Sequence, residues 1–303
     1  MENQAAKTIM MVRPKHFGFD IESAISNPFQ KEDGADDIAN IQELALVEFD
    51  NAVDSLRLAG LRVIVIEDSD KPIKPNAIFP NNWVSFHKKF AILYPMMASN
   101  RRAERREEVF AELSKYHFEF ENIIDLSSSE SDNKYLESTG SIIFDYPNKL
   151  AYASKSDRTD PEILDLICNK VGFDAVVFDA FDKNGLSIYH TNVLMCLAKE
   201  YCVICVESIP NEQRADVIDR LENTGHEIIS ISLDQMYAFA GNMFEVENSQ
   251  GESVLVMSSA AFGSLEQGQI KKLEQYSKLI QVPIPTIEKY GGGSIRCMMC
   301  RVN

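Results

Sequence analysis

The stretch NVLMCLAKEYCVICVES, residues 192–208, contains two apolar runs separated by the polar pair Lys199 and Glu200. Short runs of this kind are typical of buried β-strands, and two polar residues between them are typical of a tight turn. A helical pattern follows over residues 209–225 and ends at Gly225. The stretch therefore predicts a β-hairpin followed by a helix.

The same arrangement recurs on both sides of this stretch. Hairpins are predicted at 140–154, with a turn at 146–149, and at 241–258, with a turn at 248–251. Further strands are predicted at 8–12, 61–67, 90–94, 174–178 and 227–233, and further helices at 38–60, 101–116, 159–173 (which opens with an Asp-Pro start signal) and 264–278. Alternating hairpins and helices indicate an α/β or α+β protein, and they favour a pseudo-symmetric assembly over a doubly wound sheet.

Composition indicates an ordinary globular chain. Its 303 residues are 45% hydrophobic and 25% charged, with a formal net charge of -16. An acidic surface repels phosphates and anionic lipids, so nucleic-acid and membrane partners are not expected. We see no signal peptide, bilayer-length apolar run or nucleotide-binding glycine motif, and we expect a cytoplasmic protein with reduced thiols. A homo-oligomer is compatible with the sequence.

Two CxxC pairs raise the question of a metal site. Cys202 with Cys205, and Cys297 with Cys300, have a spacing that is common in zinc proteins. However, residues 201–208 resemble a buried strand, and the two pairs lie about ninety residues apart. We therefore expect no metal, and we interpret Cys168, Cys196, Cys202 and Cys205 as core residues. A zinc protein with four cysteine ligands remains an alternative.

Cys297 has a different setting. It follows the glycine run 291–293 and lies beside Arg296, with Arg301 close behind. Glycines allow close backbone approach, and nearby positive charge favours the reactive thiolate. Cys297 is thus either a nucleophile or a core cysteine near a chain end.

A nucleophilic cysteine needs a proton shuttle. His190 stands where a polar loop enters the hairpin at 192–208, which is a suitable place to present an imidazole to a cleft. Glu137 stands at the mouth of the hairpin at 140–154 and is a candidate carboxylate partner. The alternative for His190 is a structural, hydrogen-bonded histidine.

These segments together resemble the guanidino-group-modifying superfamily of arginine deiminases, dimethylarginine dimethylaminohydrolases and amidinotransferases. The resemblance covers roughly residues 76–300 and includes Gly291-Gly292-Gly293-Ser294-Ile295-Arg296-Cys297-Met298 and Tyr189-His190-Thr191-Asn192. It implies that Cys297 is the nucleophile, His190 the proton shuttle and Glu137 the associated acid. It also implies a five-bladed α/β propeller, or pentein fold, of ββαβ units around a central site, with 1–303 as a single catalytic domain.

The resemblance extends to residues that would hold the substrate. Ser156-Asp157-Arg158-Thr159 is similar to the family's Ser-x-Arg-Thr segment, so Arg158 would bind the substrate α-carboxylate. Asn81 and Asn82 occupy the place of an aspartate that grips the guanidinium in relatives. Arg101 and Arg102 resemble another arginine segment on the substrate side.

Two departures from the family pattern bear on the substrate. The second acid of the family's Glu-Gly-Gly-Asp motif is missing after Glu137, and Asn82 replaces the aspartate. A neutral amide suits a ureido group, since it offers both a donor and an acceptor. Together with Phe-Pro-Asn-Asn-Trp at 79–83, this is most similar to the citrulline-utilisation hydrolases.

We therefore expect a cofactor-free, cysteine-dependent hydrolase of a small amino acid. The expected substrate is citrulline, converted to ornithine, ammonia and CO2. The alternatives are arginine or an acylated arginine on the same scaffold, and a non-catalytic amino-acid-binding protein.

Overall fold

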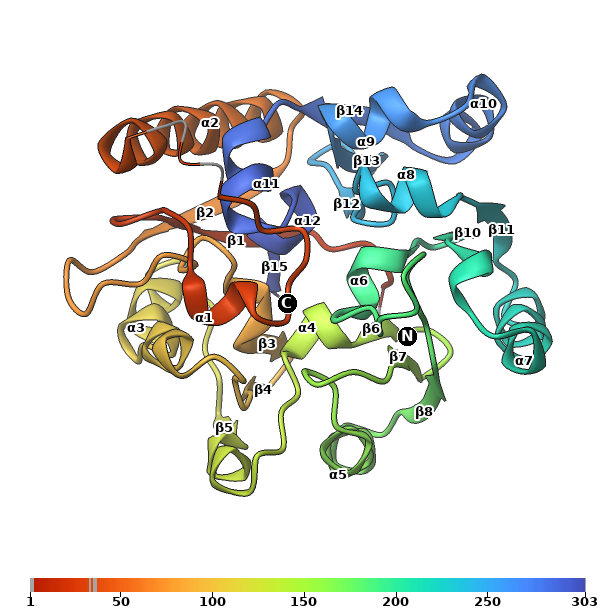
Figure 1. Cartoon of the computed structure of the whole chain (residues 1–303), viewed down its shortest axis with the longest axis horizontal. Coiled ribbons are helices and arrows are strands. Elements are labelled where there is room, and N and C mark those ends of the chain that lie inside the picture. The colour runs from red at the N-terminus through yellow and green to blue at the C-terminus, as the bar shows by residue number, and fades with distance from the viewer. Residues whose placement is uncertain (1–2, 33, 35–36, 303) are drawn as a thin grey trace.

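The computed structural model describes residues 3–32, 34 and 37–302, and it contains five three-stranded sheets arranged in a ring around a central axis (Figure 1). We number the ββαβ units by the order of their second strands. Their strands are β15 (Cys300–Val302), β1 (Thr8–Arg13) and β2 (Arg62–Glu67) in unit 1; β3 (Val84–His87), β4 (Phe90–Leu93) and β5 (Asn122–Asp125) in unit 2; β6 (Ile143–Asp145), β7 (Leu150–Ser154) and β8 (Asp174–Phe178) in unit 3; β9 (Met195–Leu197), β10 (Tyr201–Ile204) and β11 (Glu227–Ser230) in unit 4; and β12 (Phe244–Glu247), β13 (Ser253–Ser258) and β14 (Lys278–Val282) in unit 5.

Every unit has the same pairing. Its first two strands are antiparallel and its second and third are parallel, as in unit 4, where Val203 pairs with both Cys196 and Ile229. The longest helix of each unit lies between its second strand and its third, because parallel neighbours need a crossover connection. These helices are α2 (Ile38–Leu58), α3 (Glu108–Ser114), α5 (Pro161–Val171), α7 (Asn211–Asn223) and α10 (Gln267–Tyr276). The predicted fold of five ββαβ units is confirmed.

The ring is closed by strands from opposite ends of the sequence. β15 supplies the first strand of unit 1 and pairs antiparallel with β1, placing Ile9 opposite Arg301. The pairing of β1 with β15 holds the preceding segment, which contains Cys297, close to the central axis.

Apolar faces turned toward the sheets hold the helices in place. In α2, Ile41, Ala45, Phe49, Ala52 and Leu56 are all buried at helical spacing. In α5, the Asp160 side chain accepts hydrogen bonds from the Glu162 and Ile163 amides, which confirms the predicted Asp-Pro helix start.

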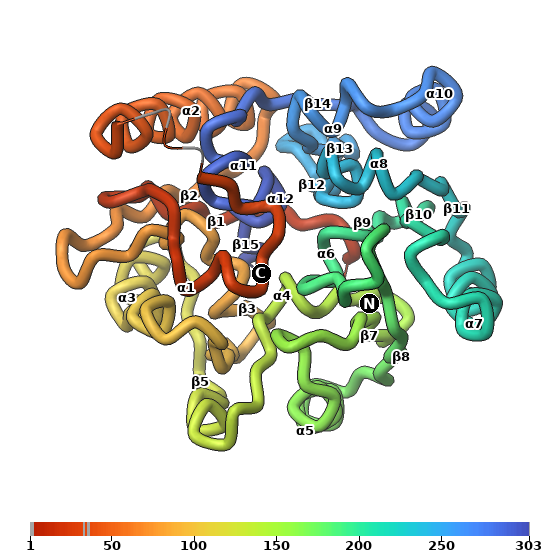
Figure 2. The backbone as a smooth tube through the Cα atoms, in the orientation of Figure 1, coloured from red at the N-terminus to blue at the C-terminus, as the bar shows by residue number. Residues whose placement is uncertain are grey.

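Short helical turns precede most of the first strands. They are η1 (Pro80–Asn82), α4 (Ser138–Ser141), α6 (Thr191–Leu194) and α12 (Ile295–Met298). The remaining helical segments are α1 (Ile21–Ala24), α8 (Leu233–Tyr237), α9 (Ser259–Ser264), α11 (Pro285–Gly291), η2 (Ser99–Glu104), η3 (Ser127–Asp132) and η4 (Val206–Ser208). The N-terminal segment with α1 lies beside α11 and α12, as Figure 2 shows, and the Asn27 side chain donates to the Gly292 carbonyl.

Two predictions about local structure were wrong. The single helix predicted at 101–116 is divided into η2 and α3, because Arg101 and Glu104 turn inward and pair in the interior. The strand predicted at 201–208 ends at Ile204, and η4 follows, with the Ser208 hydroxyl donating to the Cys205 carbonyl.

Neither a zinc site nor a membrane span finds support in the described residues. No three of their His, Cys, Asp and Glu side chains are placed to hold a metal ion, so the two CxxC pairs do not form a four-cysteine zinc site. In the same part of the chain, no helix combines the length and apolar character needed to cross a bilayer.

Candidate active site

Each of the five units brings one polar side chain to the same end of the axis. These residues are Asn82, Glu137, His190, Asn242 and Cys297, and each lies in the turn before its unit's first strand. First strands of neighbouring units contact one another around the axis, as β6 does β9 and β15 does β3. Since the turns precede equivalent strands, the fold gathers their side chains at one place.

A small cavity lies where these turns meet. Its volume of about 10 Å³ is room for roughly one water molecule. Among the described residues, the lining is Ser23, Asn27, Asn76, Phe79, Asn82, Arg101, Arg158, Tyr189, His190, Gly291, Gly292, Gly293 and Cys297. We call this space the Cys297 cavity; the segment around α1 covers it.

Two side-chain amides are directed at the Cys297 sulfur. Asn242 Nδ2 lies 3.3 Å and Asn192 Nδ2 3.5 Å from Sγ. Asn242 is itself held, because its Oδ1 accepts from the Arg296 amide at 3.1 Å and its Nδ2 donates to the Asn192 carbonyl at 3.0 Å. The two amides therefore fix the position of the sulfur within the site.

The glycine run before Cys297 is required by close packing. A Cβ on Gly292, which has φ of +62°, would lie 2.6 Å from the Gln30 amide nitrogen, and one on Gly291 would lie 2.8 Å from the Phe79 ring. The glycines therefore pack closely against the Phe79 ring and the covering segment, and their predicted close approach to a ligand stays a prediction.

His190 and Glu137 form a buried hydrogen-bonded pair. His190 Nε2 lies 2.8 Å from Glu137 Oε2, and Arg158 Nη1 donates to the same oxygen at 3.3 Å. Burial opposes ionisation of Glu137, but the Arg158 charge and the hydrogen bond from His190 outweigh it and lower the pKa of Glu137 below its usual range. Burial lowers the pKa of His190 to about 4, so the imidazole is neutral at pH 7 in this closed arrangement.

Gly140 allows this pair to approach Asn82. A Cβ at Gly140 would lie 2.9 Å from the His190 ring and 2.6 Å from Asn82 Nδ2. The glycine thus stands where any side chain would separate the imidazole from the amide.

Arg101 links Asn82 to a second buried acid. Its Nη1 donates to Asn82 Oδ1 at 3.0 Å, while its Nε and Nη2 contact Glu104 at 2.8 and 2.9 Å. This bidentate pair is fully enclosed and fixes the orientation of the Asn82 amide. Asn82 Nδ2 is buried and has no hydrogen-bond partner among the described residues, so it remains available to a ligand.

Two predicted substrate residues are not brought to the Cys297 cavity. Arg102 is directed at Glu130, with Nε 3.2 Å from Oε2, and at the Met96 carbonyl. Asn81 is buried, with its carbonyl accepting from Thr139, and it lies behind Asn82 rather than in the lining. The alternation of neighbouring side chains explains both, since adjacent residues point in different directions.

Sequence reasoning also missed residues that the structure places in the site. Asn242 precedes the first strand of unit 5, in the position where Glu137 and His190 precede theirs, and this repeat position was the available signal. The Ser23 and Asn27 side chains arrive from a covering segment whose sequence carries no comparable pattern.

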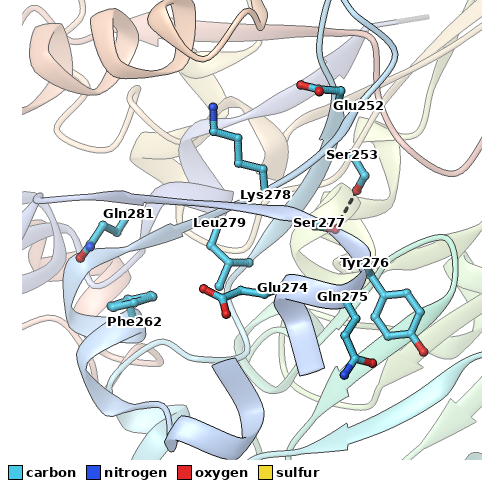
Figure 3. Close-up of a pocket in the computed structure, with 10 residues that line it drawn as sticks. All are labelled: Glu252, Ser253, Phe262, Glu274, Gln275, Tyr276, Ser277, Lys278, Leu279 and Gln281. Carbon is cyan, nitrogen blue, oxygen red and sulfur yellow. Dashed lines mark hydrogen bonds between the residues drawn. The ribbon is translucent and has the colours of Figure 1, made fainter. Parts of the chain in front are cut away.

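A more open hollow lies on the outer side of unit 5, between α9, α10 and β14 (Figure 3). Glu252, Phe262, Lys278 and Gln281 are among the residues that line it. None of the predicted site residues lines it.

Comparison with known proteins agrees with the observed fold. The family model of the eukaryotic N,N dimethylarginine dimethylhydrolases matches residues 13–303. No curated protein matches the sequence significantly.

Solved structures share the fold at low sequence identity. The chain is 17% identical to ArgZ, an arginine dihydrolase of the cyanobacterial ornithine-ammonia cycle, with a TM-score of 0.75 over 97% of this chain and 40% of that one. The N-terminal domain of ArgZ bound to product gives the same identity and TM-score over 98% of this chain and 97% of that domain.

A dimethylarginine dimethylaminohydrolase structure, an adduct with S-methyl-L-thiocitrulline, has a TM-score of 0.68 and 17% identity over 98% of this chain and 99% of its own. Because the family model covers nearly the whole chain, this protein belongs to the eukaryotic N,N-dimethylarginine dimethylhydrolase family, within the pentein superfamily of enzymes that hydrolyse guanidino C–N bonds.

Proposed function

We propose that the chain is a cysteine-dependent hydrolase of the guanidino group of free arginine. The observation that carries the proposal is that one cavity contains Cys297, facing two amide donors, and His190, oriented by Glu137. A nucleophile with a positioned proton shuttle is the arrangement that covalent hydrolysis requires. Residues 1–303 would act as one catalytic domain, of which residues 1–2, 33, 35–36 and 303 lie outside the described structure.

In the first step, Cys297 Sγ attacks the central guanidino carbon and passes its proton to His190. The departing amine takes that proton as the C–N bond breaks, which leaves an amidino group covalently bound to the sulfur. In the second step, His190 removes a proton from water, the oxygen attacks the same carbon, and the sulfur leaves. The products of this cycle are citrulline and ammonia.

The other side chains position the substrate relative to Cys297 and His190. Asn82 Nδ2 is the free donor at the reacting end, and Glu137 orients His190. Arg158 Nη2 now donates to the Ser23 carbonyl and the Ser26 hydroxyl at 2.8 and 2.7 Å. When the covering segment moves to admit substrate, these donors become free to take the α-carboxylate, with Arg101 on the same side.

Arginine is better supported than citrulline, our expectation from the sequence. The neutral Asn82 amide is compatible with either, and ArgZ and AgrE, which share the fold, are described with arginine or its products. A second candidate substrate is a methylated arginine, which the family model favours.

A substrate screen tests the proposal. Purified protein is incubated separately with arginine, Nω,Nω-dimethylarginine and citrulline, and the products are identified by mass. We expect arginine to be consumed with release of ammonia. Consumption of dimethylarginine or citrulline with arginine untouched would overturn the substrate, and complete hydrolysis of arginine to ornithine would show that a second cycle follows.

A covalent trap tests the mechanism separately. A haloacetamidine should add one amidine to Cys297, identified by peptide mass, and free arginine should protect against it. Absence of the adduct in folded protein that still binds arginine would favour a non-catalytic binding protein.

A further inference from the structure

A second cavity lies further along the axis, beyond the turns that form the Cys297 cavity. Its volume is about 40 Å³, room for roughly three water molecules. Among the described residues, the lining comes mostly from first strands and the turns before them: Thr139, Ile142, Ile143, Phe144, Tyr146, Cys196, Leu197, Met243, Phe244, Glu245, Arg296 and Arg301, with Gln4. We call it the Arg296 cavity; it shares no lining residue with the Cys297 cavity.

Arg296 brings an unneutralised guanidinium to this space. The residue is only 7% exposed. Its Nη1 donates to the Met299 carbonyl at 2.8 Å, and its guanidinium carbon lies 4.2 Å from the centre of the Phe244 ring. A guanidinium has five N–H donors, so most of them remain for the cavity.

Two other interior arginines, Arg101 and Arg158, are paired with carboxylates. Arg101 contacts Glu104, and Arg158 contacts Glu137. Among the described residues, no carboxylate forms an ion pair with Arg296. Burial of the charge lowers the pKa of Arg296, as expected where desolvation is not offset by an anion.

Glu245 is the carboxylate that lines the Arg296 cavity, but both of its oxygens already accept hydrogen bonds from other groups. It lines the same cavity, with Oε1 accepting from the Ser253 hydroxyl at 2.7 Å and Oε2 from the Lys199 amide at 2.8 Å. Burial raises the pKa of Glu245.

We propose that the Arg296 cavity is a binding site for a small planar oxyanion of the carboxylate class, such as formate or bicarbonate. The planar fork of a guanidinium matches two oxygens of a planar anion, which a spherical ion cannot reproduce. The volume admits three or four heavy atoms and excludes an amino acid. Arg301 also lines the cavity, but its Nη1 and Nη2 donate to the Gln4 and Asn3 carbonyls at 2.7 Å, so the proposed site is built on the Arg296 guanidinium.

The site is distinct from the proposed catalysis and does not depend on it. Arg296 and Cys297 are neighbours in α12, yet they line different cavities, so an anion can reach the guanidinium without entering the space meant for substrate.

Binding of isotope-labelled anions tests the site. The line width of carbon-13-labelled formate, and in a second arm of labelled bicarbonate, is measured by NMR with wild-type protein, Arg296→Gln, Cys196→Leu and Arg158→Gln. Cys196→Leu fills the cavity while keeping the arginine, and Arg158→Gln removes a cation from the Cys297 cavity. Thermal unfolding of each variant establishes that it is folded.

We expect broadening with wild type and Arg158→Gln, and at least tenfold weaker binding in Arg296→Gln and Cys196→Leu. Chloride at equal ionic strength should not displace the anion. Unchanged binding in Cys196→Leu, loss in a folded Arg158→Gln, displacement by chloride, or no binding to wild type would each overturn the proposal. Should Arg296→Gln fail to fold, the cavity-filling variant decides.

Discussion

The two axial cavities differ in how their arginines are neutralised. In the Cys297 cavity, Arg101 and Arg158 each contact a buried glutamate, while in the Arg296 cavity the guanidinium contacts a carbonyl and an aromatic ring. Paired cations hold a geometry, and an unpaired cation attracts an anion from outside. One ring of turns and strands thus holds both the paired arginines of the proposed active site and the unpaired Arg296 of the proposed anion site.

The largest expected effect separates the two cysteines of the CxxC pair. Cys297→Ser should lower turnover by more than about 10³-fold, because the hydroxyl is a far weaker nucleophile. Cys300→Ser is the matched control and should retain activity, since the Cys300 sulfur is directed at the Val84 carbonyl in the interior. If steady-state assays show equal losses of turnover in both variants, Cys297 is not the nucleophile.

Removing one member of a paired arginine should strongly destabilise the protein. Arg101→Met leaves Glu104 buried and unpaired, which costs about 3–5 kcal/mol of unfolding free energy. Urea unfolding measures the change, and the double variant Arg101→Met with Glu104→Leu should recover most of it. A double variant as unstable as the single one would mean that the ion pair is not the cause.

Acid should weaken the protein through its buried histidines. Burial, with the nearby Arg301 and Lys149 charges, lowers the pKa of His87 to about 3, against about 6.5 in an unfolded chain. The folded state excludes this proton, so its stabilisation is present above pH 6.5 and is lost as the pH falls toward 3.

Between pH 7 and 5 this loss is about 2 kcal/mol for His87. His87→Phe, which preserves the contact with the Phe90 ring, should remove that part of the urea-measured pH dependence and leave the part due to His190. An unchanged slope in the variant would show that His87 takes up its proton without unfolding.

Loss of one amide donor should weaken the nucleophile. Asn242→Ala removes the contact at 3.3 Å to the Cys297 sulfur and should slow its alkylation by iodoacetamide about tenfold at neutral pH, the equivalent of one good hydrogen bond. Asn248→Ala, in the β12–β13 turn, is the control. If the two variants react at the same rate, Asn242 has no part in holding a reactive sulfur.

The smallest effect is expected on the Arg296 side. Arg296→Met should change the unfolding free energy by no more than about 1 kcal/mol, because no carboxylate is left behind and only the bond to Met299 is lost. A loss comparable to that of Arg101→Met in the same urea titration would reveal an internal partner and remove the contrast between the cavities.

Local structure was the most predictable part of this fold. The hairpin turns at 146–149 and 248–251 are confirmed, since turn residues and strand residues lie within a few positions of each other. The pairing of β15 with β1 was accessible only through family resemblance, because nothing in the local pattern of residues 300–302 selects a partner near residue 9.

Most of the site residues could be predicted, because their side chains have characteristic chemical roles and occur in recognisable sequence motifs. Cys297, His190, Glu137, Asn82, Arg101 and Arg158 are brought together as expected, although their roles stay predictions. Arg102 and Asn81 were placed wrongly because side-chain direction depends on the division of 101–116 into two helical segments and on the tight turn of η1. Residues from four units line the Arg296 cavity, so no pattern within a single segment of the sequence predicts it.

The closure of unit 1 by β15 sets an order of events during protein synthesis. Units 2 to 5 contain all their own strands and can form as the ribosome adds residues, whereas unit 1 waits for Cys300–Val302. The proposed nucleophile, three residues before that strand, reaches the axis in the same final step. A nascent chain therefore carries Glu137 and His190 before Cys297 has been added, and the proposed reactivity requires that β15 has closed unit 1.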